Sequence, residues 1–191
     1  MRKSSEQVSR DTYRRQPTVA NYSRLSGLLS LSLMVLAPFV VAAVSGQTEN
    51  EIAKIRAEVA KINKAVPKFQ KTIKNVENIS LEGTEATYYR SGESVKKIAA
   101  TMFGETYNAK GDFYYREGEL IFAYRKRSQY DTQIGLRKPP KVVRVEEQRF
   151  YFANGELIRL LVGKKELKPT GERYSELKDE IINISGKLAA P

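Results

Sequence analysis

The chain of 191 residues contains no cysteine, no histidine and no tryptophan. The absence of cysteine excludes a disulfide framework, a thiolate nucleophile and lipid attachment to a cysteine. The absence of histidine removes the commonest general base and the commonest zinc ligand. The sequence also shows no glycine-rich phosphate loop before a helix and no metal-ligand spacing. We therefore assign no catalytic residue, no metal site and no cofactor from the sequence.

An apolar stretch without charge runs from Leu28 to Val44, after an amino terminus that carries six basic and two acidic side chains. Small residues lie at and just after its end: Ala42, Ala43, Ser45 and Gly46. This pattern is typical of a secretory signal that is cleaved before Gln47, and an uncleaved membrane anchor is the alternative. Positive charge ahead of the stretch keeps the amino terminus in the cytoplasm in either case. We expect the folded part to be periplasmic or secreted, without a membrane span if the signal is cleaved.

The part of the chain after residue 46 is basic. Removing residues 1–46 takes away six basic and two acidic side chains, which leaves 27 basic and 20 acidic residues and a net charge of +7. A basic exported protein can contact anionic envelope polymers or lipid headgroups, although a lysine-rich surface also serves solubility alone.

Two segments have the spacing of amphipathic helices. In residues 47–66, isoleucines and valines recur every three or four positions, Thr48 and Glu51 have capping-box spacing, and Pro67 ends the segment. In residues 175–188, leucines and isoleucines repeat at helical spacing after Ser175, which we expect to be the N-cap. Each helix has one apolar face that must be covered, and a sheet is the obvious partner.

Between these segments a short phrase occurs three times, at residues 88–93, 114–119 and 151–156. Each copy places two aromatic residues before a two-residue turn that ends in glycine, followed by glutamate and an apolar run. Such turns favour type I′ hairpins, and Asn154-Gly155 is the strongest of the three. The expected cross-strand pairs are Tyr115/Leu120, Tyr114/Ile121, Phe113/Phe122, Phe152/Leu157, Tyr151/Ile158 and Tyr88/Val95. Tyr88, Tyr114 and Tyr151 would then line one face of the sheet.

The second hairpin is apolar on both faces, which predicts a central position with cover above and below. Residues 68–79 alternate poorly and contain lysines that suit an exposed edge strand. Together these observations predict an α+β domain over residues 47–191. We expect an antiparallel sheet of six or seven strands in residues 68–163, flanked by the helices at 47–66 and 175–188.

The hairpin phrases resemble the Tyr-Tyr-x-x-Gly repeats of MORN-like and antitoxin-type repeat proteins. Together with the signal segment, the helix and the run Phe103-Gly104-Glu105-Thr106, they also resemble a group of uncharacterised exported bacterial proteins. The resemblance covers roughly residues 82–162. It implies export and a sheet but no activity. The spacings of 26 and 37 residues between copies differ from the regular arrays of MORN-type proteins.

Binding residues are expected near the longest loop, residues 128–141, because long loops commonly carry function. The tyrosines of the hairpins, with the basic residues among them, could instead form a stacking platform for nucleic acid or sugar. Core packing explains those tyrosines better, and we do not expect nucleic acid as a partner. The candidate binding residues are Tyr124, Arg125, Arg127, Tyr130, Arg137 and Lys138.

These observations favour an exported binding or structural protein of the bacterial cell envelope, with no enzymatic activity. Its partner would be a protein or an anionic envelope polymer. The alternative is an exported hydrolase. It would use carboxylates, for which the candidates are Glu105, Asp112, Glu146 and Glu147, or a pair of Ser94 with Lys96 or Lys97.

Overall fold

The computed structural model describes residues 39–135 and 139–190, with side chains from residue 46 onward. Two helices and eight strands follow one another along the chain, so the α+β prediction is confirmed and the expected six or seven strands become eight. The elements are α1 (Phe39–Ala65), a 3₁₀ turn (Val66–Lys68), β1 (Gln70–Val76), β2 (Thr84–Ser91), β3 (Ser94–Gly104), β4 (Tyr107–Arg116), β5 (Glu119–Tyr130), β6 (Val142–Ala153), β7 (Glu156–Val162), β8 (Lys165–Glu166) and α2 (Glu172–Ala189).

The eight strands form one antiparallel sheet in which spatial order equals sequence order. The expected edge strand is β1, and its lysines, Lys71 and Lys74, are exposed, which suits a sheet edge. The eighth strand, β8, is a two-residue edge that pairs with β7. None of the helices among the described residues is long and apolar enough to cross a membrane.

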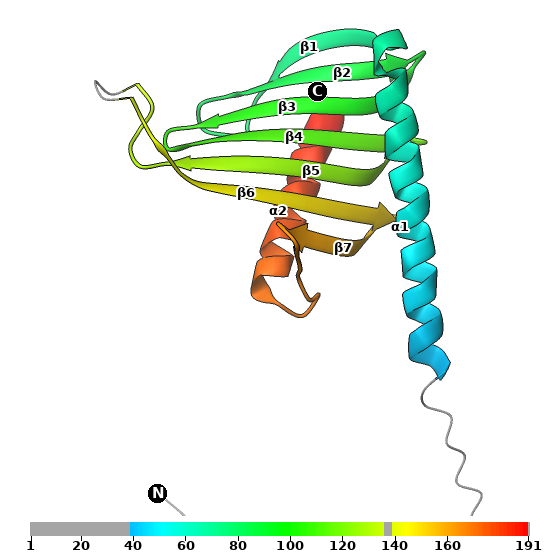
Figure 1. The fold of residues 1–191 in the computed structure, drawn as a ribbon. Coiled ribbons are helices and arrows are strands. Elements are labelled where there is room, and N and C mark those ends of the chain that lie inside the picture. The colour runs from blue at the N-terminus through cyan, green and yellow to red at the C-terminus, as the bar shows by residue number, and fades with distance from the viewer. Residues whose placement is uncertain (1–38, 136–138, 191) are drawn as a thin grey trace, which may run out of the picture. The chain divides into compact units, whose positions relative to one another are not determined.

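The helices lie on opposite faces of the sheet (Figure 1). α2 covers one face, where aromatic and aliphatic side chains from β2 to β7 pack against Tyr174, Leu177 and Ile181. α1 covers part of the other face through Ile52 and Ile55. α2 begins at Glu172 with Gly171 as its N-cap, so the prediction that Ser175 caps it is wrong. Ser175 lies one turn inside the helix.

Each of the three hairpins contains a β-bulge, which the sequence did not predict. The extra residue is Lys96 in the first hairpin, Ile121 in the second and Ile158 in the third, in each case the third residue after the turn. The pairs nearest the turns, Tyr115/Leu120 and Phe152/Leu157, are confirmed. Beyond the bulge the register moves by one. Tyr114 therefore pairs with Phe122, Phe113 with Ala123 and Tyr151 with Arg159.

The first hairpin also turns one residue later than expected. Ser91 pairs with Ser94, so the turn is Gly92-Glu93, with φ of 57° at Gly92. Tyr88 consequently pairs with Ile98 and faces α2, whereas Tyr114 and Tyr151 face α1. The prediction that the three tyrosines share one face is wrong, because a shift of one residue moves a side chain to the opposite face.

All three tyrosines are buried core residues. Tyr88 is 1% exposed, and Tyr114 and Tyr151 are each 4% exposed. The hydroxyl of Tyr88 donates to the carbonyl of Leu188 at 3.0 Å, and that of Tyr114 donates to Asn63 Oδ1 at 3.0 Å. Buried tyrosine hydroxyls that have partners of this kind are typical of packing sites. The tyrosines therefore connect the sheet to the helices and leave no stacking platform at these positions.

Candidate functional site

A polar cavity of about 320 Å³ lies on the α2 side of the sheet, beside the first turns of α2. Its walls come from β5, β6 and α2. The lining residues are Arg125, Arg127, Gln129, Arg144, Glu146, Gln148, Arg173, Leu177 and Glu180. Strand alternation explains the arrangement, since every second residue of β5 and β6 points to the same face and their neighbours point away. The face of the sheet that carries the apolar core beneath α2 therefore becomes polar where it reaches the cavity.

Arg125 is the centre of the site and is 2% exposed. Its guanidinium forms a two-pronged ion pair with Glu180 on α2, with Nη1 and Nη2 each 2.6 Å from a carboxylate oxygen. Its Nε donates to Gln148 Oε1 at 2.7 Å. A buried guanidinium needs this degree of pairing, because an uncompensated buried charge is costly. These bonds connect α2 to β5 and β6 in the sheet.

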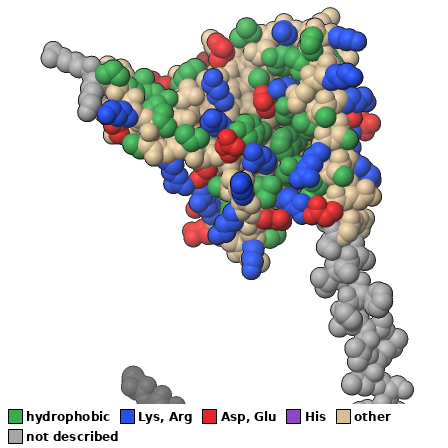
Figure 2. All heavy atoms as spheres, in the orientation of Figure 1, with side chains coloured by type: hydrophobic (Ala, Val, Ile, Leu, Met, Phe, Trp, Pro, Cys, Tyr) green, Lys and Arg blue, Asp and Glu red, His purple; other side chains and the backbone are tan. Residues whose placement is uncertain are grey.

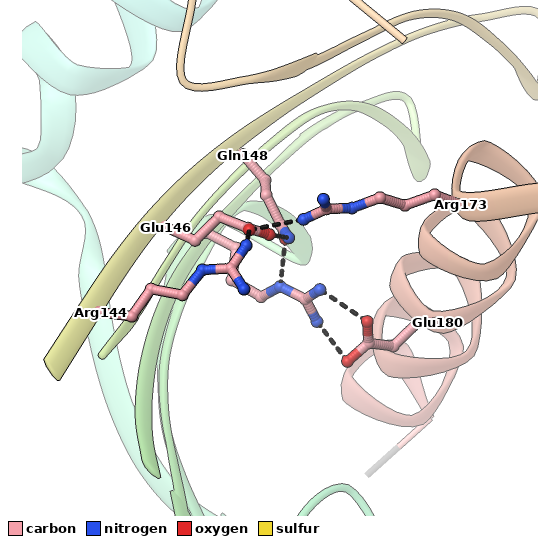
Figure 3. A network of polar contacts seen from close by, with 6 residues as sticks. Arg144, Glu146, Gln148, Arg173 and Glu180 are labelled. Atoms are coloured by element: carbon pink, nitrogen blue, oxygen red, sulfur yellow. Dashed lines mark hydrogen bonds and ion pairs between the residues drawn. The ribbon is translucent and has the colours of Figure 1, made fainter. Parts of the chain in front are cut away.

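Gln148, which is also 2% exposed, extends the network to Glu146. Its Nε2 donates to Glu146 Oε1 at 2.6 Å, while Arg144 and Arg173 both reach Glu146 Oε2, at 2.6 and 2.5 Å. Figure 3 shows these side chains converging from the sheet and from α2. One carboxylate oxygen is therefore shared by two guanidinium groups.

The Glu146 carboxyl group is held in its ionised form. Burial opposes ionisation, but hydrogen bonds from Arg173 and Gln148 and the charges of Arg173 and Arg144 outweigh it and lower the Glu146 pKa. Both carboxylates of the cavity are thus engaged by arginine. A general acid at neutral pH needs a raised pKa, so the lowered pKa of Glu146 is opposite to what that role requires.

The predicted binding residues do not all lie at the cavity. Arg125 and Arg127 line the cavity together. Tyr124 lies between them in sequence and points to the opposite face, where the guanidinium carbon of Arg149 is 5.6 Å from its ring centroid. Tyr130 lies at the end of β5, paired with Val142. Arg137 and Lys138 lie outside the described residues, and the expected loop at 128–141 is shortened because β5 extends to residue 130.

Apart from Glu146, which the sequence offered only as a candidate hydrolase carboxylate, the cavity residues from β6 and α2 were not predicted. A partial signal was available in α2, because Arg173 and Glu180 lie at helical spacing with Leu177, at the border of the apolar stripe. Charged residues at such a border can pair with charged groups of the sheet beneath the helix. In β6, Glu146 and Gln148 alternate with outward-facing neighbours, but nothing in the sequence gives their partner strand.

Among the described residues the candidate hydrolase carboxylates do not form one cluster: Asp112 and Glu147 both lie near Tyr124, whereas Glu146 and Glu105 lie elsewhere. Asp112 lies in β4 on the α1 side and pairs with Lys97 at 3.0 Å, whereas Glu146 is on the α2 side. Glu105 lies at a strand end, bonded to Gln133. Burial alone would lower the pKa of Lys97, but the Asp112 hydrogen bond and charge raise it, which is opposite to what a lysine base requires.

On the α1 side, the described residues include basic and acidic side chains close together. Figure 2, which views this side, shows basic side chains spread over the surface with acidic ones among them. A cavity of about 340 Å³ there is lined by small and polar residues around Asp112 and Tyr124. The α2-side cavity is the better defined candidate site because buried, hydrogen-bonded side chains, Arg125 and Gln148, form its wall.

Comparisons of the chain with protein-family models, with curated proteins and with solved structures gave no match in any of the three.

Proposed function

We propose that this chain is a non-enzymatic binding protein of the bacterial cell envelope and that the α2-side cavity holds its ligand. The observation that carries the proposal is the cavity of about 320 Å³ with polar walls fixed by the Arg125–Gln148–Glu146 network. Small-molecule sites combine such a volume with a few polar groups in fixed positions. The ligand is accordingly a small polar molecule.

The polar network supports a ligand role more than a purely structural one. Apolar side chains of similar volume commonly stabilise a fold as well as a buried ion pair does, because burial removes the hydration of both charges. The walls of the cavity, in contrast, need groups that stay in place when a polar ligand enters. The buried residues Arg125 and Gln148 meet that need, since hydrogen bonds restrain both side chains.

Export is part of the proposal and rests on the sequence of residues 1–46, where basic residues precede the apolar stretch Leu28–Val44. A fusion of alkaline phosphatase after residue 191 tests it, because the enzyme is active only outside the cytoplasm. We expect high phosphatase activity, and low activity when two arginines are introduced into the apolar stretch. Equal activities would remove the export part of the proposal.

Binding is tested by thermal denaturation of the full chain, purified in mild detergent, against a panel of small carboxylates, phosphates, amines and neutral sugars. At least one class should raise the melting temperature in a saturable way, since a ligand that binds only the folded state stabilises it. The control is Gln129→Trp, which places a large side chain at the cavity wall. A ligand that stabilises both proteins equally binds elsewhere, and a panel with no saturable effect contradicts the proposed function.

A further inference from the structure

The cavity carries an excess of positive charge. Four guanidinium groups, from Arg125, Arg127, Arg144 and Arg173, face two carboxylates, from Glu146 and Glu180. The lining therefore has a net charge of +2. Guanidinium groups are also the side chains whose planar fork best matches the oxygens of carboxylate and phosphate groups.

The four arginines do not have equal freedom. Arg125 uses Nε, Nη1 and Nη2 in its bonds to Gln148 and Glu180 and is buried, so it holds the wall in place. Arg144 and Arg173 reach the same oxygen of Glu146 through Nη2, and their side chains are 64% and 49% exposed. A guanidinium has five N–H donors, so most donors of these two arginines are not used by that bond.

Arg127 differs from the other three. Among the described residues it has no carboxylate within ion-pair distance. Its guanidinium lies over the ring of Tyr107, with the guanidinium carbon 4.0 Å from the ring centroid. Stacking occupies the face of a guanidinium and leaves the N–H donors at its edge free. Its neighbour across the strands is Glu146, so Arg127 lies beside the shared carboxylate and its two arginines.

We infer that the cavity binds the oxyanion group, carboxylate or phosphate, of a small ligand. Arg127 is the principal binding residue, and the unused donors of Arg144 and Arg173 complete the site. This inference rests on the proposed function and adds to it the ligand class and the residues that select it. A cationic ligand would meet like charge, and a neutral one would leave the arginine charges without a counter-charge.

The test is a titration followed by NMR at fixed ionic strength, which observes the arginine Nε–Hε signals of the full chain in detergent. Inorganic phosphate and succinate are the two anionic probes, and they distinguish the two oxyanion types. Glucose and choline are the neutral and cationic probes. We expect saturable shifts of the Arg127 signal with at least one anion and none with glucose or choline.

Three variants test whether Arg127 itself binds the anion. Arg127→Gln should weaken anion binding by about tenfold or more, because it removes a charged hydrogen-bond donor. Arg127→Lys should recover part of the loss, since it keeps the charge without the fork. Lys126→Gln is the matched control, because it removes the same charge from the adjacent residue, which points to the opposite face and is exposed. Its effect should stay within twofold.

Glu146→Gln should act in the opposite direction and tighten anion binding several-fold, because it frees two guanidinium groups. Equal weakening by Lys126→Gln and Arg127→Gln would overturn the inference, as it would indicate attraction to overall charge. Binding of glucose or choline but of neither anion would overturn the ligand class and leave the proposed function standing. If no probe binds and the wider small-molecule panel also fails, both are wrong.

Discussion

At the scale of single residues, Arg125 shows how a charge is kept in the middle of a sheet. Its side chain is 3% exposed, whereas its partner Glu180 is 41% exposed. The two partners of this ion pair therefore differ in their access to water. Water can replace the arginine around Glu180, but nothing can replace Glu180 around the buried guanidinium. Loss of the glutamate should be the more damaging change.

Glu180→Ala should lower the free energy of unfolding by about 3 kcal/mol at pH 7, because it leaves a buried charge without compensation. Adding Arg125→Met removes that charge, and the double variant should recover most of the loss. Urea denaturation measures both. The control is Glu176→Ala, an exposed glutamate one turn earlier in α2, with an expected effect within about 0.5 kcal/mol. A Glu180→Ala effect no larger than the control would contradict the argument.

Tyr115 provides a second prediction, for alkaline pH. Burial raises the pKa of Tyr115 to about 12, despite the hydrogen bond with Ser185, from about 10 in an unfolded chain. The folded state keeps a proton that the unfolded state loses. The resulting stability, about 2–3 kcal/mol, is complete below pH 10 and is lost as the pH rises from 10 to 12.

Urea denaturation between pH 8 and 11 should therefore show stability falling above pH 10. Tyr115→Phe combined with Ser185→Ala should show a shallower fall, because the double variant removes both polar partners and leaves no unpaired hydroxyl. The absorbance of the double variant at 295 nm should show one tyrosine fewer among those that ionise at high pH. An unchanged slope of stability against pH would show that Tyr115 is not the group responsible.

At the scale of elements, the hairpin turns show how local chemistry sets register. In the second and third hairpins both turn residues have positive φ: 55° and 86° at Glu117-Gly118, and 51° and 76° at Asn154-Gly155. These values belong to type I′ turns. Asparagine tolerates this region of φ better than glutamate does, so the second turn is less favourable than the third.

Exchanging the two residues tests this difference. Glu117→Asn should stabilise the protein by about 0.5–1 kcal/mol, and Asn154→Glu should destabilise it by a similar amount, because the cost belongs to the left-handed backbone conformation. Each change has the other as its control, and thermal denaturation measures both. Effects of the same sign would mean that side-chain contacts, rather than φ, determine the preference at these turns.

The same elements show what a sequence can and cannot predict about this fold. Composition and periodicity were enough to locate the two helices, the three hairpins and the edge strand, because those signals are local, but not to fix their ends: α1 begins at Phe39 rather than at residue 47, and α2 begins at Glu172. The bulges at Lys96, Ile121 and Ile158 were not predictable from pairing rules, since a bulge depends on how the neighbouring strands twist. Their common position after each turn makes them part of the repeat.

The candidate site was predictable only on one strand. Arg125 and Arg127 were predicted as basic residues close to the loop at 128–141, and the structure places both on the cavity side of β5. The partners of Arg125, Gln148 and Glu180, come from elements 23 and 55 residues farther along the chain, and no local pattern connects them. Tyr124 lies on the opposite face of the same strand, away from the cavity, because adjacent residues in a strand point in opposite directions.

At the scale of the whole molecule, the two helices are held by cores of unequal size. The α2 side has one large cluster of buried residues that spans the sheet and includes Ile181 and Leu188, both 0% exposed. The α1 side has two small clusters around Ile52, Ile55 and Ile62. Stability is not uniform within a fold, and elements with fewer buried contacts open first. α1 should therefore separate from the sheet more readily than α2.

Hydrogen exchange with mass spectrometry tests this order of opening. Ile55→Ala should accelerate exchange within α1 and leave β4 and β5 nearly unchanged, because it weakens only the docking of that helix. Ile181→Ala should accelerate exchange across the sheet and lower the global free energy of unfolding by about 2–5 kcal/mol, the usual cost of such a cavity in a core. Both isoleucines are fully buried, so the substitutions are matched in chemistry and differ in location. Equal acceleration of β4 and β5 by both variants would mean that α1 unfolds only together with the sheet.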